Sequence, residues 1–166
     1  MNPRSKPSLV LVSLLLLSLL SPAAFAAGTA KKEEPEDSAE TAYNAGVEQM
    51  KAGNWADAAK HLGEAVEMKG DFAEAHSNLG YCLRKQGAEH YKVALKHYNR
   101  AIELDSKLAQ AYHYRGVLHA LAGDEALAKA DHATLMDLDR ELADELMAVI
   151  ASGEEPEGHN GAVGWD

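Results

Sequence analysis

Between residues 39 and 152, small and apolar residues recur at the spacing of one face of an α-helix. Residues three, four and seven positions apart lie on the same side of a helix, because the helix turns once in about 3.6 residues. Two kinds of face alternate three times along the chain, so the pattern predicts six helices joined as three hairpins. The first helices carry Ala42, Ala45, Gly46, Gln49; His76, Leu79, Gly80, Leu83; and Tyr112, Arg115, Gly116, His119; the second carry Ala58, Leu62, Ala65, Val66; Ala94, Tyr98, Ala101, Ile102; and Ala128, His132, Leu135.

The three hairpins are also repeats of one another. Each carries a pair of glycines with six residues between them, and these pairs recur at separations of 34 and then 36 positions. The two extra residues of the second unit lie between Gly87 and Ala94, where we expect an exposed turn, because added length costs little in a surface connection. The glycine pairs are Gly46 and Gly53, Gly80 and Gly87, and Gly116 and Gly123.

The two glycines of a unit have different expected roles. The first falls inside a helix, where glycine costs about 1 kcal/mol relative to alanine, so we expect it to let two helix backbones approach closely. The second falls between two helices, where a left-handed residue that ends a helix favours glycine. The close approaches are expected opposite Ala58, Ala94 and Ala128, and Asn54 and Asp124 are the expected N-caps of second helices.

These residues resemble the tetratricopeptide repeat, a helical hairpin of about 34 residues. The second unit matches its pattern most fully, through Leu79-Gly80, Gly87, Tyr91, Ala94, Tyr98 and Ala101. The resemblance implies an all-α fold, a right-handed α-solenoid of three hairpins plus a C-terminal capping helix. The implied domain is residues 39–152, with repeats at about 39–72, 73–108 and 109–142 and a cap helix at 140–152 that has Asp139 as its N-cap.

The N-terminus has the features of a secretory signal peptide. Arg4 and Lys6 precede an aliphatic run from Leu9 to Leu20, and Ala24-Phe25-Ala26 offers a small-residue cleavage site. The run is shorter than the roughly 20 residues that cross a bilayer as a helix. We therefore predict a signal peptide at 1–26 and an exported protein of a bacterial periplasm, with no integral membrane segment after cleavage; a retained anchor is the alternative.

Polar, acidic segments flank the predicted repeats. Residues 27–38 and 153–166 lack apolar periodicity and contain proline and many charges. Such composition predicts a disordered linker and a disordered tail, in which Glu154 and Glu155 are interpreted as solvated charges. Trp165 in the tail is either a docking motif or part of a frayed terminus.

The charge of the chain excludes some classes of partner. The formal net charge is −10, and it becomes −12 when Arg4 and Lys6 leave with the signal peptide. Nucleic acids need clustered basic residues, so we predict no nucleic-acid partner. The single cysteine, Cys82, forms no internal disulfide.

The sequence offers little chemistry. It contains no HExxH, CxxC or GxSxG motif, and none of its eight histidines has a partner at HxxxH spacing. We therefore expect no enzyme, no catalytic residue, no metal and no cofactor. The alternatives are a histidine site using His113 or His119, and a reactive Cys82 activated by Arg84 and Lys85, although a buried and inert cysteine is favoured.

Binding of a partner is the remaining kind of function that the sequence supports. In the family that the repeats resemble, the first helices line a concave groove that receives a peptide or a partner protein. A specialised carboxylate clamp of that family is not expected, since only Asn78 stands at a matching place. The resemblance puts these residues in the groove: Tyr43, Val47, Met50, Glu74, Ser77, Tyr81, Arg84, Lys85, Gln110, His113 and Val117.

The predicted function is thus noncatalytic binding of a protein partner in the cell envelope. The alternative is a structural or self-associating subunit of an envelope assembly, because a short array has apolar ends, here around residues 43–47 and 146–150.

Overall fold

The computed structural model describes residues 38–155, and every regular element in this part of the chain is helical. The sequence predictions for 1–26, 27–37, 156–166 and Trp165 concern residues outside this range. The elements are α1 (Ala39–Lys51), α2 (Trp55–Met68), α3 (Ala73–Gln86), the short 3₁₀ helix η1 (Ala88–His90), α4 (Tyr91–Leu104), α5 (Ala109–Leu121), α6 (Glu125–Leu138) and α7 (Arg140–Ser152).

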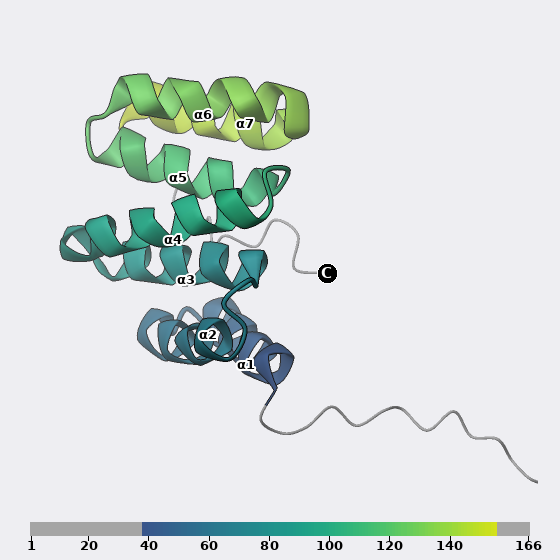
Figure 1. Ribbon diagram of the computed structural model, residues 1–166. Helices are drawn as coiled ribbons and strands as arrows, with labels where there is room; N and C mark the ends of the chain where they lie inside the picture. Colours follow the sequence, from purple (N-terminus) through teal and green to yellow (C-terminus); the bar gives the residue numbers. More distant parts are fainter. Residues whose placement is uncertain (1–37, 156–166) are drawn as a thin grey trace, which may run out of the picture. The chain divides into compact units, whose positions relative to one another are not determined.

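The helices stack as three hairpins and a cap, as predicted. α1 packs on α2, α3 on α4 and α5 on α6, and each hairpin rests on the next (Figure 1). α3 also contacts both α1 and α5, so these three helices form one side of the stack. α7 closes the array by packing on both α5 and α6. The fold is an all-α solenoid of helical hairpins.

Two apolar clusters hold the stack together. The first lies among α1 to α5 and contains Met50, Leu62, Tyr81 and Tyr98, all essentially inaccessible to solvent. The second joins α5, α6 and α7 through side chains such as Leu146. Fully burying one such large side chain contributes about 1.5–3 kcal/mol, so stability rests on packing in a chain whose only cysteine is unpaired.

The glycines inside helices mark close contacts between helices. A Cβ atom on Gly46 would stand 2.6 Å from Leu62 Cγ and 3.3 Å from the carbonyl oxygen of Ala58. A Cβ on Gly80 would stand 2.7 Å from the Tyr98 ring and 3.1 Å from the Ala94 carbonyl oxygen. The predicted partners Ala58 and Ala94 are therefore confirmed for these two units.

The third unit differs from the prediction. A Cβ on Gly116 would collide with Leu146 and would stand 3.2 Å from Asp131 Cβ, so its nearest neighbours do not include Ala128. The reason is the cap, because α7 takes the place that a further repeat would occupy and pushes Leu146 against α5.

The ends of the helices are partly as predicted. Gly53 and Gly123 have φ of 76° and 85°, and Gly87 has φ of 137° and ψ of 169°, a conformation essentially confined to glycine. Asn54 and Asp124 occupy the N-cap positions, but their side chains do not make the capping hydrogen bond. Asp139 does cap α7, accepting from the backbone N–H groups of residues 141 and 142.

The two extra residues of the second unit are accommodated by η1. This turn follows Gly87, and its Ala88 and Glu89 are exposed, as expected for an insertion between helices.

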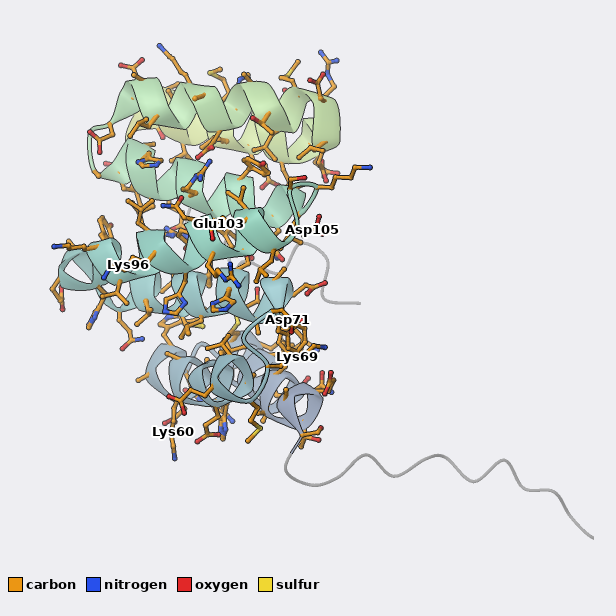
Figure 2. All side chains as sticks on the ribbon, in the orientation of Figure 1. Lys60, Lys69, Asp71, Lys96, Glu103 and Asp105 are labelled. Atoms are coloured by element: carbon orange, nitrogen blue, oxygen red, sulfur yellow. The ribbon has the colours of Figure 1, made fainter. Side chains whose placement is uncertain are left out.

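Charged side chains cover the outside of the stack. Lys60 extends away from the helices (Figure 2), and Lys60, Lys96 and Glu103 are all exposed. Within residues 38–155, no helix has the length and apolar character needed to cross a membrane.

Candidate partner-binding groove

The predicted groove residues all lie on the three helices that form one side of the stack. α1 carries Tyr43, Val47 and Met50, α3 carries five of the set, and α5 carries three. Because these helices are neighbours, the fold brings residues from three repeats onto one face. The residues on α3 are Glu74, Ser77, Tyr81, Arg84 and Lys85, and those on α5 are Gln110, His113 and Val117.

Solvent exposure divides this set into a floor and a surface. Met50, Ser77 and Val117 are buried and belong to the packed interior, so they offer no surface to a partner. Tyr81, Arg84 and His113 are buried as well. The accessible members are the half-buried Tyr43, Val47, Lys85 and Gln110 and the exposed Glu74.

Aromatic rings form the floor between α3 and α5. The rings of Tyr81 and Tyr114 lie 4.6 Å apart between centroids, and Trp55 meets Tyr81 edge-on at 5.6 Å. Tyr98 of α4 lies behind them, 6.1 Å from Tyr114. Burial raises the pKa of all three tyrosines, so their hydroxyls stay neutral and polar at physiological pH.

The α1 end of the face is fixed by Tyr43. Its ring packs against Phe72, with centroids 4.8 Å apart, and its hydroxyl accepts a hydrogen bond of 3.1 Å from Asn78 Nδ2. Burial, with the charge of Glu74 adding to it, raises the pKa of Tyr43. Asn78, which alone matched the specialised clamp, thus supports Tyr43, and its Oδ1 has no hydrogen-bond partner within the described residues.

The charged end of the face already holds a carboxylate. Arg84 Nη1 and Nη2 donate to the two oxygens of Glu155 at 2.8 and 3.1 Å, and Lys85 Nζ lies 3.4 Å from Glu155 Oε2. Burial alone raises the pKa of Glu155, but the hydrogen bonds and charge of Arg84, and then of Lys85, outweigh it and lower the pKa. The Glu155 carboxylate is therefore ionised in the folded protein.

Helix α7 brings a second carboxylate to the same side. His113 Nε2 lies 3.5 Å from Glu145 Oε2, while Gln110 donates to the Tyr114 hydroxyl at 2.8 Å. The cap helix thus completes the α5 end of the face as well as closing the apolar core.

Sequence reasoning missed Glu155. The prediction that Glu155 is a solvated charge is wrong, because its side chain is only 18% exposed and is bound by Arg84 and Lys85. The same interpretation holds for the neighbouring Glu154, which is exposed. Composition gave no signal for the difference, since both residues stand in the same acidic segment.

The remaining chemical candidates are structural. Cys82 is fully buried, and burial raises the pKa of its thiol to about 12, as the inert alternative expected. His76 and His97 pair through their Nδ1 atoms at 3.0 Å. Across residues 38–155, no three histidine, cysteine or acidic side chains come together as a metal site would require.

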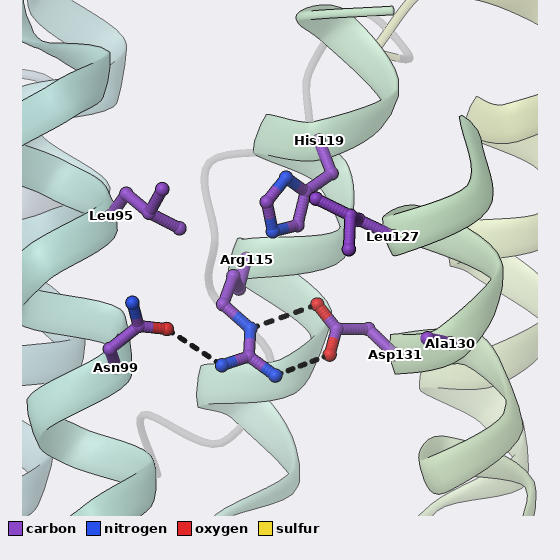
Figure 3. Close-up of a pocket in the computed structure, with 7 residues that line it drawn as sticks. All are labelled: Leu95, Asn99, Arg115, His119, Leu127, Ala130 and Asp131. Atoms are coloured by element: carbon purple, nitrogen blue, oxygen red, sulfur yellow. Dashed lines mark hydrogen bonds and ion pairs between the residues drawn. The ribbon is translucent and has the colours of Figure 1, made fainter. Parts of the chain in front are cut away.

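A cleft lies on the other side of α5, lined by residues of α4, α5 and α6. It is a cleft of about 320 Å³ between α4 and α6 (Figure 3). Arg115 spans its base, bound to Asp131 on one side and to Asn99 on the other at 2.7 Å, while His119 stands above it. Arg115, Asp131 and Asn99 are thus bonded to one another, and the apolar lining residues are Leu95, Leu127 and Ala130.

Comparison with known proteins agrees with the repeats found in the sequence. Residues 43–89 match the family described as tetratricopeptide repeat. A comparison with curated proteins finds no match.

Several solved structures share the fold. The tetratricopeptide-repeat domain of Arabidopsis OM64 aligns with a TM-score of 0.64 at 20% identity, over 69% of this chain and 94% of that one. The TPR2B domain of yeast Sti1 in complex with pHsp70 aligns with a TM-score of 0.63 at 23% identity, over 69% and 94%. PcrH, a Pseudomonas aeruginosa protein, in complex with the chaperone binding region of PopD gives 0.63 at 24%, over 73% and 94%.

The sequence match and the structural likeness agree on the same helical hairpins. Residues 43–89 match the tetratricopeptide repeat model, and residues 38–155 have the fold of tetratricopeptide-repeat domains.

Proposed function

We propose that this chain is a noncatalytic interaction module that binds a peptide or a partner protein on the face formed by α1, α3 and α5. One observation carries the proposal. This face joins three repeats, combines half-buried apolar and polar side chains with an aromatic floor, and has a buried cation that holds a carboxylate. Half-buried side chains that are held in place by packed aromatic rings suit recognition of an extended segment.

The structural neighbours support a binding role. The Sti1 domain was solved as a complex with pHsp70, and PcrH as a complex with the chaperone binding region of PopD. Both resemble this chain at less than 25% identity, so they support the class of function and leave the partner open.

The cellular location is part of the proposal. We propose that the protein is exported to the cell envelope of a bacterium and lies in the periplasm after cleavage, because residues 1–26 have the sequence features of a signal peptide. Fractionation of cells that express the full chain tests this, together with N-terminal sequencing of the exported product. A protein that stays whole in the cytosolic fraction would contradict it.

The binding role is tested with two matched variants of the exported protein. The groove variant carries Val47→Ser, Glu74→Ala and Gln110→Ala, at accessible members of the face that leave Arg84 and Glu155 untouched. The control carries Lys60→Ala, Lys96→Ala and Glu103→Ala on the outside of the stack (Figure 2). The readout is crosslinking to envelope extract followed by mass spectrometry.

We expect the wild-type protein and the control variant to capture the same partner and the groove variant to lose it. Equal capture by all three folded proteins would contradict the proposed face.

Self-association is the second candidate, and one observation favours it. Met136, Leu138 and Met147 on the two last helices are 38%, 36% and 38% exposed. Within the apolar end expected at residues 146–150, Leu146 is fully buried and Met147 is exposed. A molar mass that rises with concentration in light scattering, and returns to the monomer value in a Met136→Gln and Met147→Gln variant, would favour this candidate.

A further inference from the structure

The carboxylate that Arg84 binds belongs to a residue far away in the sequence. Glu155 lies 71 positions beyond Arg84. The local bonds of its segment run back to α7: the N–H of Gly153 donates to the Val149 carbonyl, and the N–H of Glu154 donates to Ser152 Oγ. The Glu155 side chain then reaches α3, where both of its oxygens are held by the guanidinium.

Arg84 requires a negative partner. Its side chain is only 2% exposed, and it lies beside the Tyr81 ring, with its guanidinium carbon 5.1 Å from the ring centroid. A buried guanidinium without a counter-charge is strongly unfavourable. The surroundings therefore favour an anion at this position, and the two parallel hydrogen bonds fit the two oxygens of a carboxylate.

The same surroundings do not require the carboxylate to come from Glu155. The contact with α3 described above is made through the side chain, with Lys85 Nζ as the second cation at the more accessible side. A Glu or Asp side chain of another polypeptide would offer the same two oxygens to the same three donor nitrogens.

We propose that Arg84 and Lys85 form an exchange site for carboxylates, in which an acidic side chain of the partner segment replaces Glu155. The inference rests on the proposed binding function and names the chemistry of its partner. The partner is a polypeptide with a Glu or Asp side chain inside its sequence, since the group seated at the site is the side chain of a residue that the chain continues beyond. Glu155 is then the intramolecular competitor of the partner.

Competition in the same chain has a measurable consequence. A tethered group acts at an effective concentration on the order of millimolar, so Glu155 lowers the apparent affinity for any acidic segment in solution. Removal of the Glu155 charge is expected to raise that affinity at least about tenfold. The net charge of −10 repels acidic peptides in general, so a gain restricted to one variant reports the site itself.

The test uses the full chain and a probe of known sequence. The probe is a fluorescein-labelled peptide ASGEEPEG, which repeats residues 151–158, and its control has Gln at the position of Glu155. Fluorescence anisotropy measures the affinity of each peptide for the wild-type protein, for Glu155→Gln and for Glu154→Gln. The last variant removes the same charge from the exposed neighbour and is the matched control.

We expect Glu155→Gln to bind the acidic probe at least about tenfold tighter than wild type and Glu154→Gln, with no gain for the Gln peptide. Lys85→Gln added to Glu155→Gln should weaken the probe several-fold. Equal affinity of Glu155→Gln and Glu154→Gln, or equal binding of the two peptides, would overturn the proposal.

Two further measurements test the proposal if Glu155→Gln is destabilised or does not fold. Thermal melts should show Glu155→Gln less stable than wild type and stabilised by the acidic probe. Should Glu155→Gln not fold, Glu155→Asp keeps the charge with a shorter reach and is expected to bind the probe more tightly than wild type does. If these peptide experiments fail while the groove variant still loses its partner, the binding function stands and the exchange site falls.

Discussion

Arg115 and Asp131 form a bidentate ion pair between α5 and α6. Arg115 Nη2 lies 2.6 Å from Asp131 Oδ1, and Nε lies 3.0 Å from Oδ2 (Figure 3). The two partners differ in their access to water, since the side chain of Arg115 is 21% exposed and that of Asp131 only 5%. The pair therefore protects a buried carboxylate more than it protects the guanidinium.

This difference in exposure predicts that truncating Arg115 and truncating Asp131 lower the free energy of unfolding by different amounts. Arg115→Met leaves the buried Asp131 carboxylate without its counter-charge and should cost about 3 kcal/mol of unfolding free energy. Asp131→Ala leaves a guanidinium that reaches water and Asn99, and should cost about 1–2 kcal/mol. Urea unfolding of both variants and of the double variant measures the values and their coupling. Equal costs, or a larger cost for Asp131→Ala, would contradict the argument.

Gly80 is predicted to be intolerant of a methyl group. The added Cβ would stand 2.7 Å from the ring of Tyr98, which is fully buried, and 3.1 Å from the Ala94 carbonyl oxygen. Gly80→Ala should therefore lose about 1–3 kcal/mol, although alanine is the better helix former by about 1 kcal/mol.

Gly63 provides the matched control for that substitution. It lies inside α2, and a Cβ there would meet nothing within 4 Å. Gly63→Ala should leave stability unchanged or raise it by up to about 1 kcal/mol. Thermal melts compare the stability of the two variants with that of the wild-type protein. If Gly80→Ala is as stable as wild type, α3 and α4 separate more easily than their contact indicates.

The repeat pattern predicted the fold because each hairpin packs its two helices through the same positions of the repeat. Gly46 and Gly80 lie against the backbone carbonyls of Ala58 and Ala94, which the pattern placed opposite them, and the solenoid follows from stacking such units. The third unit departed because its neighbour is α7. Gly116 therefore contacts Leu146, a residue outside the repeating period.

The groove was harder to predict than the fold. Helical spacing assigns residues to a face, but it does not give the depth of each side chain, so Met50 and Val117 were expected at the surface and lie in the interior. The docking of Glu155 depends on the direction in which the chain leaves α7, and Gly153 sets that direction with its left-handed φ of 72°. No periodic signal in the sequence reports such a contact.

Cys82 is expected to resist alkylation in the folded protein. Its pKa is raised from 9.0 to about 12 because the thiol is buried, which lowers the thiolate fraction near pH 8 about a thousandfold. The thiolate is the reactive species, so iodoacetamide should modify the native chain at less than about 1% of the rate seen in urea. Mass spectrometry over time measures both rates, and rapid modification of the native protein would place Cys82 at the surface.

The pair of His76 and His97 predicts a loss of stability in mild acid. Burial, with His76 and Lys96 adding to it, lowers the pKa of His97 to about 4, and burial also lowers the pKa of His76, with Arg100 as a smaller cause. The hydrogen bond from the ring of His76 to the Gly70 carbonyl opposes this shift without reversing it.

The sign of the effect follows from these directions. Well above pH 6.5 both rings are neutral in the folded and unfolded chains, so the pair's contribution to stability is fully present there. Between pH 6.5 and about 4 the unfolded chain binds protons that the folded chain does not, so stability falls as the pH falls through this window. Because the rings stay partly solvated, we expect a loss on the order of 1 kcal/mol at pH 5.

Urea unfolding at pH 7 and pH 5 measures this loss. His97→Gln removes one titrating ring and should reduce the difference between the two pH values, while His90→Gln, at the start of α4 and away from the pair, should not. An equal pH dependence in all three proteins would mean that the buried pair takes up its proton without opening the contact between α3 and α4, and that carboxylates elsewhere account for the acid sensitivity.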